Sequence, residues 1–150
     1  MKQKQIISKI SHIRALSYAY IEAELTARGH KGIVPSHGNI LMLLATKKEP
    51  IPINIIGTYV GKTKSTLTSN IRTLEKFGYI QKTKNPQDSR STLVSLTEKG
   101  KQFMPVFLDI SRQTLAIIYQ DMEKEEKQKL FDSLCKIENN LQQKSSHKEQ

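Results

Sequence analysis

Residues 62–80 read KTKSTLTSNIRTLEKFGYI, and this stretch decides the fold that we predict. Leu67, Ile71 and Leu74 recur at i, i+4 and i+7, which places them on one face of an α-helix. Hydroxylated and basic residues occupy the rest of the circumference. Gly78 then stands where a helix ends on a left-handed residue. The stretch therefore predicts a polar helix with one buried face and a sharp stop.

A basic hairpin is predicted directly after this helix. Residues 79–83 and 93–96 are short strand-like runs, and the charged segment KNPQDSRS at residues 84–91 joins them. A polar helix fits the major groove of duplex DNA, and a thin hairpin beside it reaches along the backbone. Residues 53–60 predict a shorter helix before the polar one, with Gly61 in the turn between them. Together these parts predict a winged helix-turn-helix.

The remaining segments predict helices at both ends of the chain. The first thirty residues show helical apolar spacing, a second helix begins with Ser36 as its N-cap, and EPIPIN at residues 49–54 is a break. A long helix begins at Thr97, and a last one begins at Asp121 or Glu123. The predicted fold class is mainly α with a small β-hairpin wing. Residues 36–97 form the winged helix-turn-helix, and residues 1–35 and 98–150 form a helical dimerisation region, because a monomer would leave their apolar stripes uncovered.

Composition favours a partner with negative charge. The chain of 150 residues has a net charge of +10, and residues 62–101 hold nine of its 24 Lys and Arg residues. Such a patch favours binding of a polyanion through counterion release. The alternatives are that the basic surface contacts an anionic membrane or is simply exposed to solvent. Cys135 is the single cysteine, so an intrachain disulfide is excluded. A signal sequence and an apolar run of about 18 residues are both missing, so we expect a cytoplasmic protein.

Two strings carry a resemblance to a known family: LEKFGYI at residues 74–80 and DSRSTLVSLTEKG at residues 88–100. With the order of the predicted elements, they resemble the MarR family of bacterial transcriptional regulators. The resemblance implies a homodimer, a repressor or an activator, that binds a palindromic operator and is not an enzyme. It also implies that a small phenolic or lipophilic effector, or oxidation of a cysteine, changes DNA affinity. Ser69 departs from the arginine that many members carry on the recognition helix, and Ser89 leaves Arg90 as the lone cation at the wing tip.

Candidate DNA contacts come from both the polar helix and the hairpin. Hydroxyl groups read base edges, lysines hold phosphates, and a guanidinium on a thin hairpin enters a narrow minor groove. We predict that Arg90 contacts DNA in this way. The alternative is that Arg90 forms an ion pair with Asp88 that shapes the turn, and both can hold, because Asp88 can also orient Arg90. The predicted DNA-binding residues are Lys62, Lys64, Ser65, Thr66, Thr68, Ser69, Arg72, Thr73, Lys84, Asp88 and Arg90.

The sequence gives little support for a metal site, a catalytic site or a nucleotide-binding site. The histidines lack metal-ligand spacing, no catalytic constellation is present, and Gly57 to Gly61 is one residue too short for a phosphate-binding loop, so we expect no cofactor and no metal. The predicted effector pocket is lined by His12, Tyr20, His37 and Met42, although His37 is more simply a surface or capping residue. The function predicted is a sequence-specific repressor. A protein-interaction module and a weakly specific architectural DNA binder are the alternatives.

Overall fold

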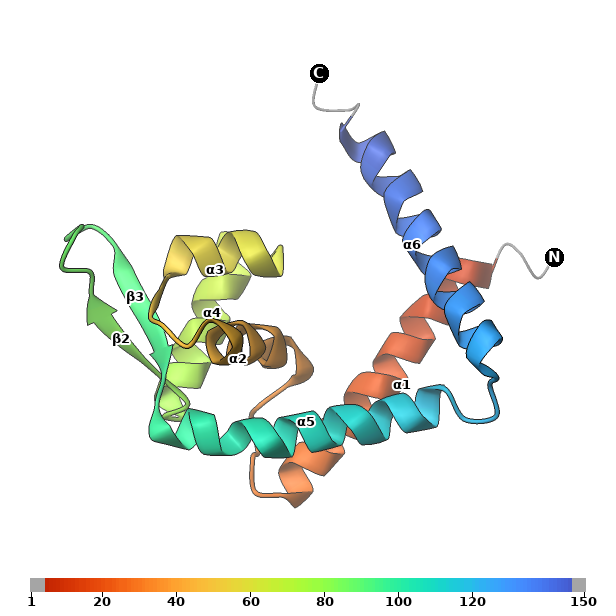
Figure 1. Ribbon diagram of the computed structural model, residues 1–150, viewed down its shortest axis with the longest axis horizontal. Helices are drawn as coiled ribbons and strands as arrows, with labels where there is room; N and C mark the ends of the chain where they lie inside the picture. Colours follow the sequence, from red (N-terminus) through yellow and green to blue (C-terminus); the bar gives the residue numbers. More distant parts are fainter. Residues whose placement is uncertain (1–4, 147–150) are drawn as a thin grey trace. The chain divides into compact units, whose positions relative to one another are not determined.

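The computed structural model describes residues 5–146, with side chains described through residue 144. It divides into two compact units, Met1–Thr114 and Leu115–Gln150. The first contains α1 (Ile6–Ala27), α2 (Pro35–Lys47), β1 (Ile51–Pro52), α3 (Ile53–Val60), α4 (Lys64–Lys76), β2 (Ile80–Lys84), β3 (Thr92–Leu96) and most of α5 (Glu98–Ile118). The second contains α6 (Lys124–Ser146). The mainly helical fold with a small hairpin wing is therefore confirmed (Figure 1).

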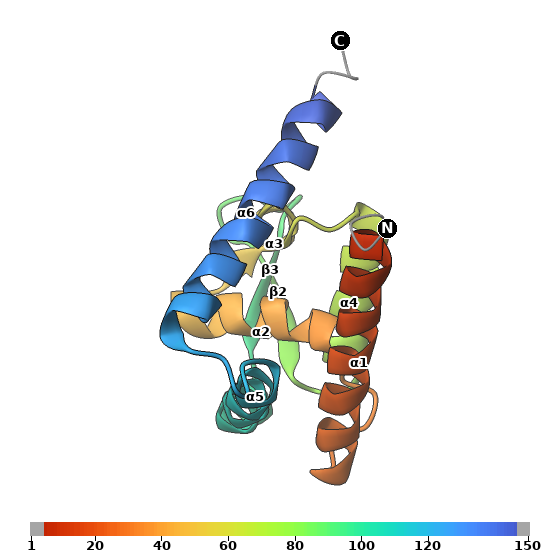
Figure 2. The same ribbon diagram turned by 90° about the vertical axis from the view of Figure 1, so that its right-hand side faces the viewer.

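Apolar side chains from every layer of the first unit meet in one core. Figure 2 views α5 nearly end-on, with α2 crossing above it. Gly38 allows this approach, because a Cβ there would meet the Phe107 ring at 2.0 Å. On α4 the predicted face of Leu67, Ile71 and Leu74 is buried. The opposite face of that helix is thereby turned to solvent.

The sheet has three antiparallel strands in the order β1-β3-β2. The predicted hairpin is confirmed within one residue at each end, and Ile80 pairs with Leu96 while Lys84 pairs with Thr92. The predicted break at residues 49–54 does separate α2 from α3, but the sequence did not predict that Ile51 and Pro52 within it form β1 and pair with Val94 and Leu93. An edge strand tolerates proline, since one side of it needs no hydrogen-bond donor.

The helices end where the sequence predicts, but one predicted N-cap is wrong. Gly61 and Gly78 have φ values of +59° and +77°, as the predicted stops require. The Ser36 N-cap was wrong: α2 begins at Pro35, which is preorganised for the first helical position. The Val34 N–H, just before the helix, donates to Nδ1 of His37 at 3.1 Å. His37 is therefore a buried capping residue.

Candidate nucleic-acid interface

The N-terminus of α4 is built by hydroxyl groups. Thr63 is the N-cap, and its Oγ1 accepts a hydrogen bond from the Thr66 N–H at 3.3 Å. The same hydroxyl donates to Thr66 Oγ1 at 2.9 Å and lies 3.3 Å from Ser65 Oγ. Thr68 donates to the Lys64 carbonyl at 2.8 Å. Part of the hydroxyl content of this helix therefore serves the helix itself.

The exposed face of α4 keeps several polar groups without an internal partner. Ser69 and Arg72 are exposed and make no side-chain hydrogen bond or ion pair within the described residues, and the same is true of half-buried Thr73. Asn70 lies on the buried face beside His37, and its Nδ2 has no partner among the described residues. Burial lowers the pKa of His37, and the neighbouring Asn70 opposes that shift. Ser69, Arg72 and Thr73 are thus among the polar groups on this helix that remain available to a ligand, as is the exposed Lys64.

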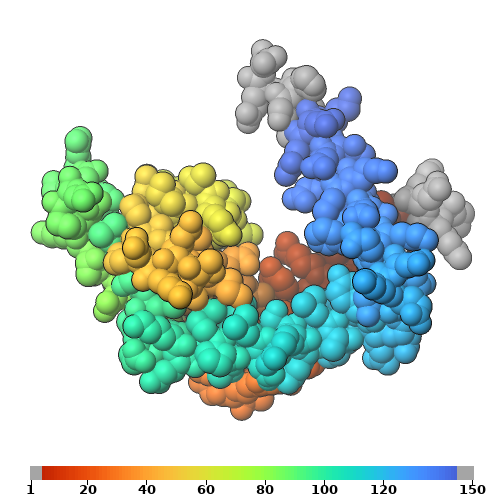
Figure 3. Space-filling view, in the orientation of Figure 1, coloured from red at the N-terminus to blue at the C-terminus, as the bar shows by residue number. Residues whose placement is uncertain are grey.

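The wing tip, residues 85–91, is held by short-range hydrogen bonds. The Arg90 N–H donates to Asp88 Oδ1 at 3.0 Å, and the Gln87 N–H donates to Asn85 Oδ1 at 3.0 Å. Arg90 Nε lies 3.8 Å from Asp88 Oδ1, and the arginine side chain is 95% exposed. In the space-filling view the hairpin tip stands out beyond α3 (Figure 3). Asp88 therefore shapes the turn. The Arg90 guanidinium projects into solvent and is held to Asp88 only by a long ion pair.

A groove of about 670 Å³ separates α3 and α4 from the wing. Five predicted residues line it: Lys62, Lys64, Thr68, Asp88 and Arg90. The other six lie outside it, with Ser65, Thr66, Ser69, Arg72 and Lys84 exposed and Thr73 half-buried. The wing is also tied to α4, because Lys82 Nζ lies 2.6 Å from Glu75 Oε2. The arrangement presents cations on both sides of a concave surface, which suits a chain of phosphates.

Sequence reasoning missed the contribution of α3 and of β3 to this groove. Asn54, Thr58, Ser91 and Thr92 also line it. Asn54 and Thr58 are four residues apart and so share one face of α3, and Thr58 donates to the Asn54 carbonyl at 3.1 Å. This polar pair at i and i+4 was the sequence signal that could have identified α3 as part of the groove.

The predicted effector residues lie on α1 and α2 and differ in exposure. His12 is exposed on α1, Tyr20 is half-buried and His37 is buried. Met42 lines a shallow depression of about 270 Å³ between α2 and α3, beside Tyr59. The effector pocket stays a prediction. Among the described residues no group of three or more His, Cys, Asp or Glu side chains is placed to hold a metal ion, and no helix is long and apolar enough to cross a membrane.

Comparison with known proteins identifies the family. A family model described as Transcriptional regulator SarA/Rot matches residues 37–105. HTH-type transcriptional regulator SarZ from Staphylococcus haemolyticus is 31% identical over 101 residues, which cover 67% of each chain. SarZ from Staphylococcus epidermidis is 33% identical over 97 residues, which cover 65% of this chain and 64% of that relative. This chain thus spans slightly less than two thirds of the length of that relative.

Solved structures share the fold along nearly the whole chain. A MarR transcriptional regulator from Methanosarcina mazei Go1 is 27% identical and superposes with a TM-score of 0.74, covering 93% of this chain and 92% of that chain. A mutant MarR from E. coli, complexed with operator DNA, superposes with a TM-score of 0.76 at 17% identity and covers 87% and 91% of the two chains. The family is one of transcriptional regulators and is not enzymatic. This chain belongs to the MarR-type family of winged-helix transcriptional regulators.

Proposed function

We propose that this protein is a cytoplasmic, DNA-binding repressor that recognises a palindromic operator as a homodimer. The observation that carries the proposal is the groove between α3, α4 and the wing, where Lys62, Lys64 and Arg90 lie on one concave surface. The exposed polar face of α4 would enter the major groove, and Arg90 would enter the flanking minor groove. The E. coli protein of the same fold is complexed with operator DNA, which supports DNA as the partner.

The homodimer is supported by apolar side chains that a single chain leaves in solvent. On α1 they are Ile6, Ile7, Ile10, Ile13 and Leu16, which are 39–78% exposed. On the end of α5 and on α6 they are Leu115, Ile117, Ile118, Leu130, Phe131, Leu134 and Leu141. Exposed apolar patches of this extent mark interfaces. A two-fold dimer would place two copies of α4 about 34–36 Å apart, one turn of B-DNA, and so requires a palindromic site.

Fluorescence anisotropy tests the proposal. The wild type and Arg90→Ala are titrated onto a palindromic duplex taken from beside the gene and onto a scrambled duplex, across a salt series. Arg112→Ala is the matched control, because this exposed arginine lies on α5 and pairs with Asp109. We expect a preference of about 10³-fold for the native duplex in the wild type and the control, and a preference about tenfold or more smaller in Arg90→Ala.

Two results would contradict this function. Equal and steeply salt-dependent binding to both duplexes would identify an architectural binder, which Ser69 in place of an arginine favours. Failure to bind either duplex at low salt would instead favour a protein-interaction module, because a fold does not fix a function.

A further inference from the structure

A polar pair lies in the core of the first compact unit, where α2 packs against α4. His37 on α2 and Asn70 on α4 are only 3% and 9% exposed. On α4 Asn70 interrupts the buried face that Leu67, Ile71 and Leu74 form. Burying polar groups costs free energy unless new hydrogen bonds replace those made with water. An apolar pair would serve the core better, so the presence of this pair indicates a role other than stability.

The hydrogen bonds of His37 determine which ring nitrogen is left for Asn70. Nδ1 accepts the Val34 N–H at 3.1 Å, so the neutral ring carries its proton on Nε2. Burial keeps the ring neutral, because it lowers the pKa of His37. Asn70 is the side chain that hydrogen-bonds to this ring, and its Oδ1 is the atom able to accept a proton. Its Nδ2 has no partner among the described residues, so the contact is a single directional one.

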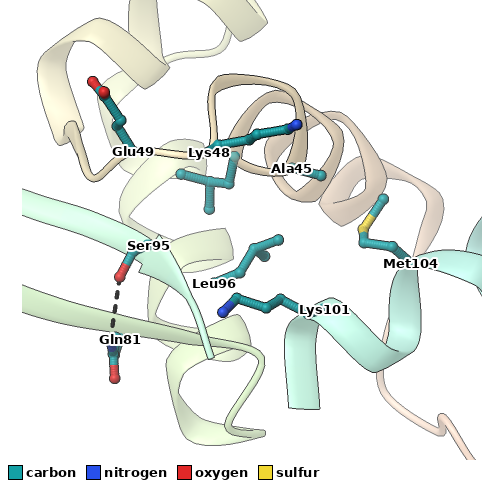
Figure 4. Close-up of a pocket in the computed structure, with 9 residues that line it drawn as sticks. Ala45, Lys48, Glu49, Gln81, Ser95, Leu96, Lys101 and Met104 are labelled. Atoms are coloured by element: carbon teal, nitrogen blue, oxygen red, sulfur yellow. Dashed lines mark hydrogen bonds between the residues drawn. The ribbon is translucent and has the colours of Figure 1, made fainter. Parts of the chain in front are cut away.

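The C-terminal end of α4 is attached by two lysines. Lys99 Nζ donates to the C-cap carbonyl of α4 at 2.7 Å. Lys82 Nζ, on β2, lies 2.6 Å from Glu75 Oε2. The hairpin that carries Lys82 is itself linked across its strands, because Gln81 Nε2 donates to Ser95 Oγ at 3.3 Å (Figure 4). Polar contacts thus fix this end of the helix to both α5 and the wing.

The N-terminal part of α4, residues 64–73, is attached differently. Its printed hydroxyl bonds are local, since Thr66 bonds to Thr63 and Thr68 bonds to the Lys64 carbonyl. Among the described residues, Asn70 makes the one polar side-chain contact from this part to another element. Apolar surfaces attract without direction, whereas a hydrogen bond requires a particular geometry. A single buried polar residue can therefore fix the register of packed helices at a cost in stability.

We propose that Asn70 is a positioning residue for DNA recognition: its contact with His37 fixes the rotation of α4 about its own axis. The inference rests on the proposed function, because the exposed groups that it aims, among them Ser69 and Arg72, are those expected to meet the operator. Side chains reach about 5–6 Å from a helix axis, so a rotation of about 10° moves their ends by about 1 Å. Such a shift is enough to break hydrogen bonds to base edges, while contacts to phosphates tolerate it.

A double apolar variant, His37→Met/Asn70→Leu, separates positioning from stability. Replacing both partners by apolar groups of similar size leaves no buried polar group unpaired between the helices. We expect the urea midpoint to stay within about 1 M of the wild type. In fluorescence anisotropy the preference for the native over the scrambled duplex should fall about tenfold, with affinity for the scrambled duplex unchanged.

Two further variants complete the test. His37→Gln should keep the preference within about threefold of the wild type, because glutamine at this position also accepts the N-cap N–H and retains a donor for Asn70. Asn39→Leu is the matched control: it makes the same exchange at an exposed position of α2 and should change neither midpoint nor preference. Amide NMR spectra of the DNA-free protein give a readout without the operator. We expect broadened or doubled resonances for residues 64–73 in the double apolar variant and single sharp ones in the wild type and in Asn39→Leu.

The proposal is overturned if the double apolar variant keeps the full preference and sharp resonances, since packing alone would then orient α4. A midpoint lowered by more than about 1 M would overturn it too, because the pair would then serve stability. So would a loss of preference in His37→Gln as large as in the double variant. A wild type without preference for the native duplex would contradict the proposed function, and the spectra would then decide this inference alone. In that case broadened resonances in the double variant support it, and sharp ones overturn it.

Discussion

The two ends of the wing are held in opposite ways. At the wing root, formed by Gly78, Tyr79, Thr97 and Gly100, polar groups are paired and partly buried. Thr97 Oγ1 donates to the Gly78 carbonyl at 2.5 Å and accepts from the Gly100 N–H at 3.1 Å, and the Thr97 N–H donates to the Tyr79 carbonyl at 3.1 Å. At the wing tip the Arg90 side chain is 95% exposed. The root fixes where the wing points, and the tip keeps its charge free for a partner.

This difference separates stability from binding. Aromatic rings reinforce the root. The centroid of the Phe103 ring lies 5.0 Å from that of Tyr79 and 4.6 Å from that of His30. A hydrogen bond of 2.7 Å joins His30 Nδ1 and Tyr79 Oη. Nothing comparable surrounds Arg90. Substitutions at the root should therefore change the free energy of unfolding, while those at the tip should change DNA affinity alone.

Gly100→Ala should be the most damaging change at the root. A Cβ at this position would meet the Tyr79 carbonyl oxygen at 2.1 Å, and a backbone atom cannot turn aside as a side chain does. We expect a loss of about 3 kcal/mol in the free energy of unfolding, measured by urea denaturation. Gly57→Ala is the control: the nearest atom is the flexible Leu67 Cδ2 at 3.0 Å, and alanine favours a helix, so its change should stay within about 1 kcal/mol. Equal effects of the two substitutions would show that the root is not rigid.

Thr97→Val tests the hydrogen bonds of the root without changing its shape. The substitution removes the N-cap of α5 and the bond to the Gly78 carbonyl, so we expect a loss of about 2 kcal/mol. Thr46→Val is the control, because its hydroxyl only donates to the Met42 carbonyl on an exposed helix face. That variant should change the urea midpoint very little. A loss as small as that of the control would mean that packing alone holds the root.

These residues also show how far the sequence could be interpreted. The pattern L-x-x-L-T-x-x-G at residues 93–100 pointed to the family, and the structure explains it as architecture: Thr97 caps α5 and Gly100 lets that helix touch Tyr79. Apolar periodicity and glycine stops located α4 and the hairpin, because both signals are local. β1 could not be predicted, because Ile51 and Pro52, which follow Pro50, become a strand only when β3 lies beside them.

The candidate site was predicted less completely than the fold. Charge and order along the chain identified Lys62, Lys64 and Arg90, which line one groove. Asn54 and Thr58 line the groove only because of how α3 is oriented toward the wing, and that orientation is set by tertiary packing. Burial of His37 is tertiary too, which is why a residue predicted at an effector pocket serves as a cap inside the core.

A third prediction concerns pH and the root. Burial lowers the pKa of both His30 and His37, and the positive charge of Lys99 lowers that of His30 further. The unfolded chain therefore binds more protons than the folded one below the ordinary histidine pKa of about 6.5, so stability should fall as the pH drops through that value and below. Urea midpoints at several pH values check this, and His30→Gln should flatten part of the slope. A midpoint that rises on acidification would contradict the assignment.

The smallest effect on stability is expected at the wing tip. Arg90→Ala removes only an exposed ion pair of 3.8 Å, so the free energy of unfolding should change by less than about 0.5 kcal/mol. Affinity for the operator should nevertheless fall by about tenfold or more, as loss of one groove contact of 1–3 kcal/mol implies. Asp88→Ala separates the two roles of the pair, because it removes the acceptor of the Arg90 N–H but keeps the guanidinium. If Asp88 only shapes the turn, this variant should bind more tightly than Arg90→Ala and less tightly than the wild type. If Asp88→Ala bound DNA as weakly as Arg90→Ala, Arg90 would contact DNA only when the turn is fixed. The tip would then depend on internal hydrogen bonds as the root does, though to a smaller extent.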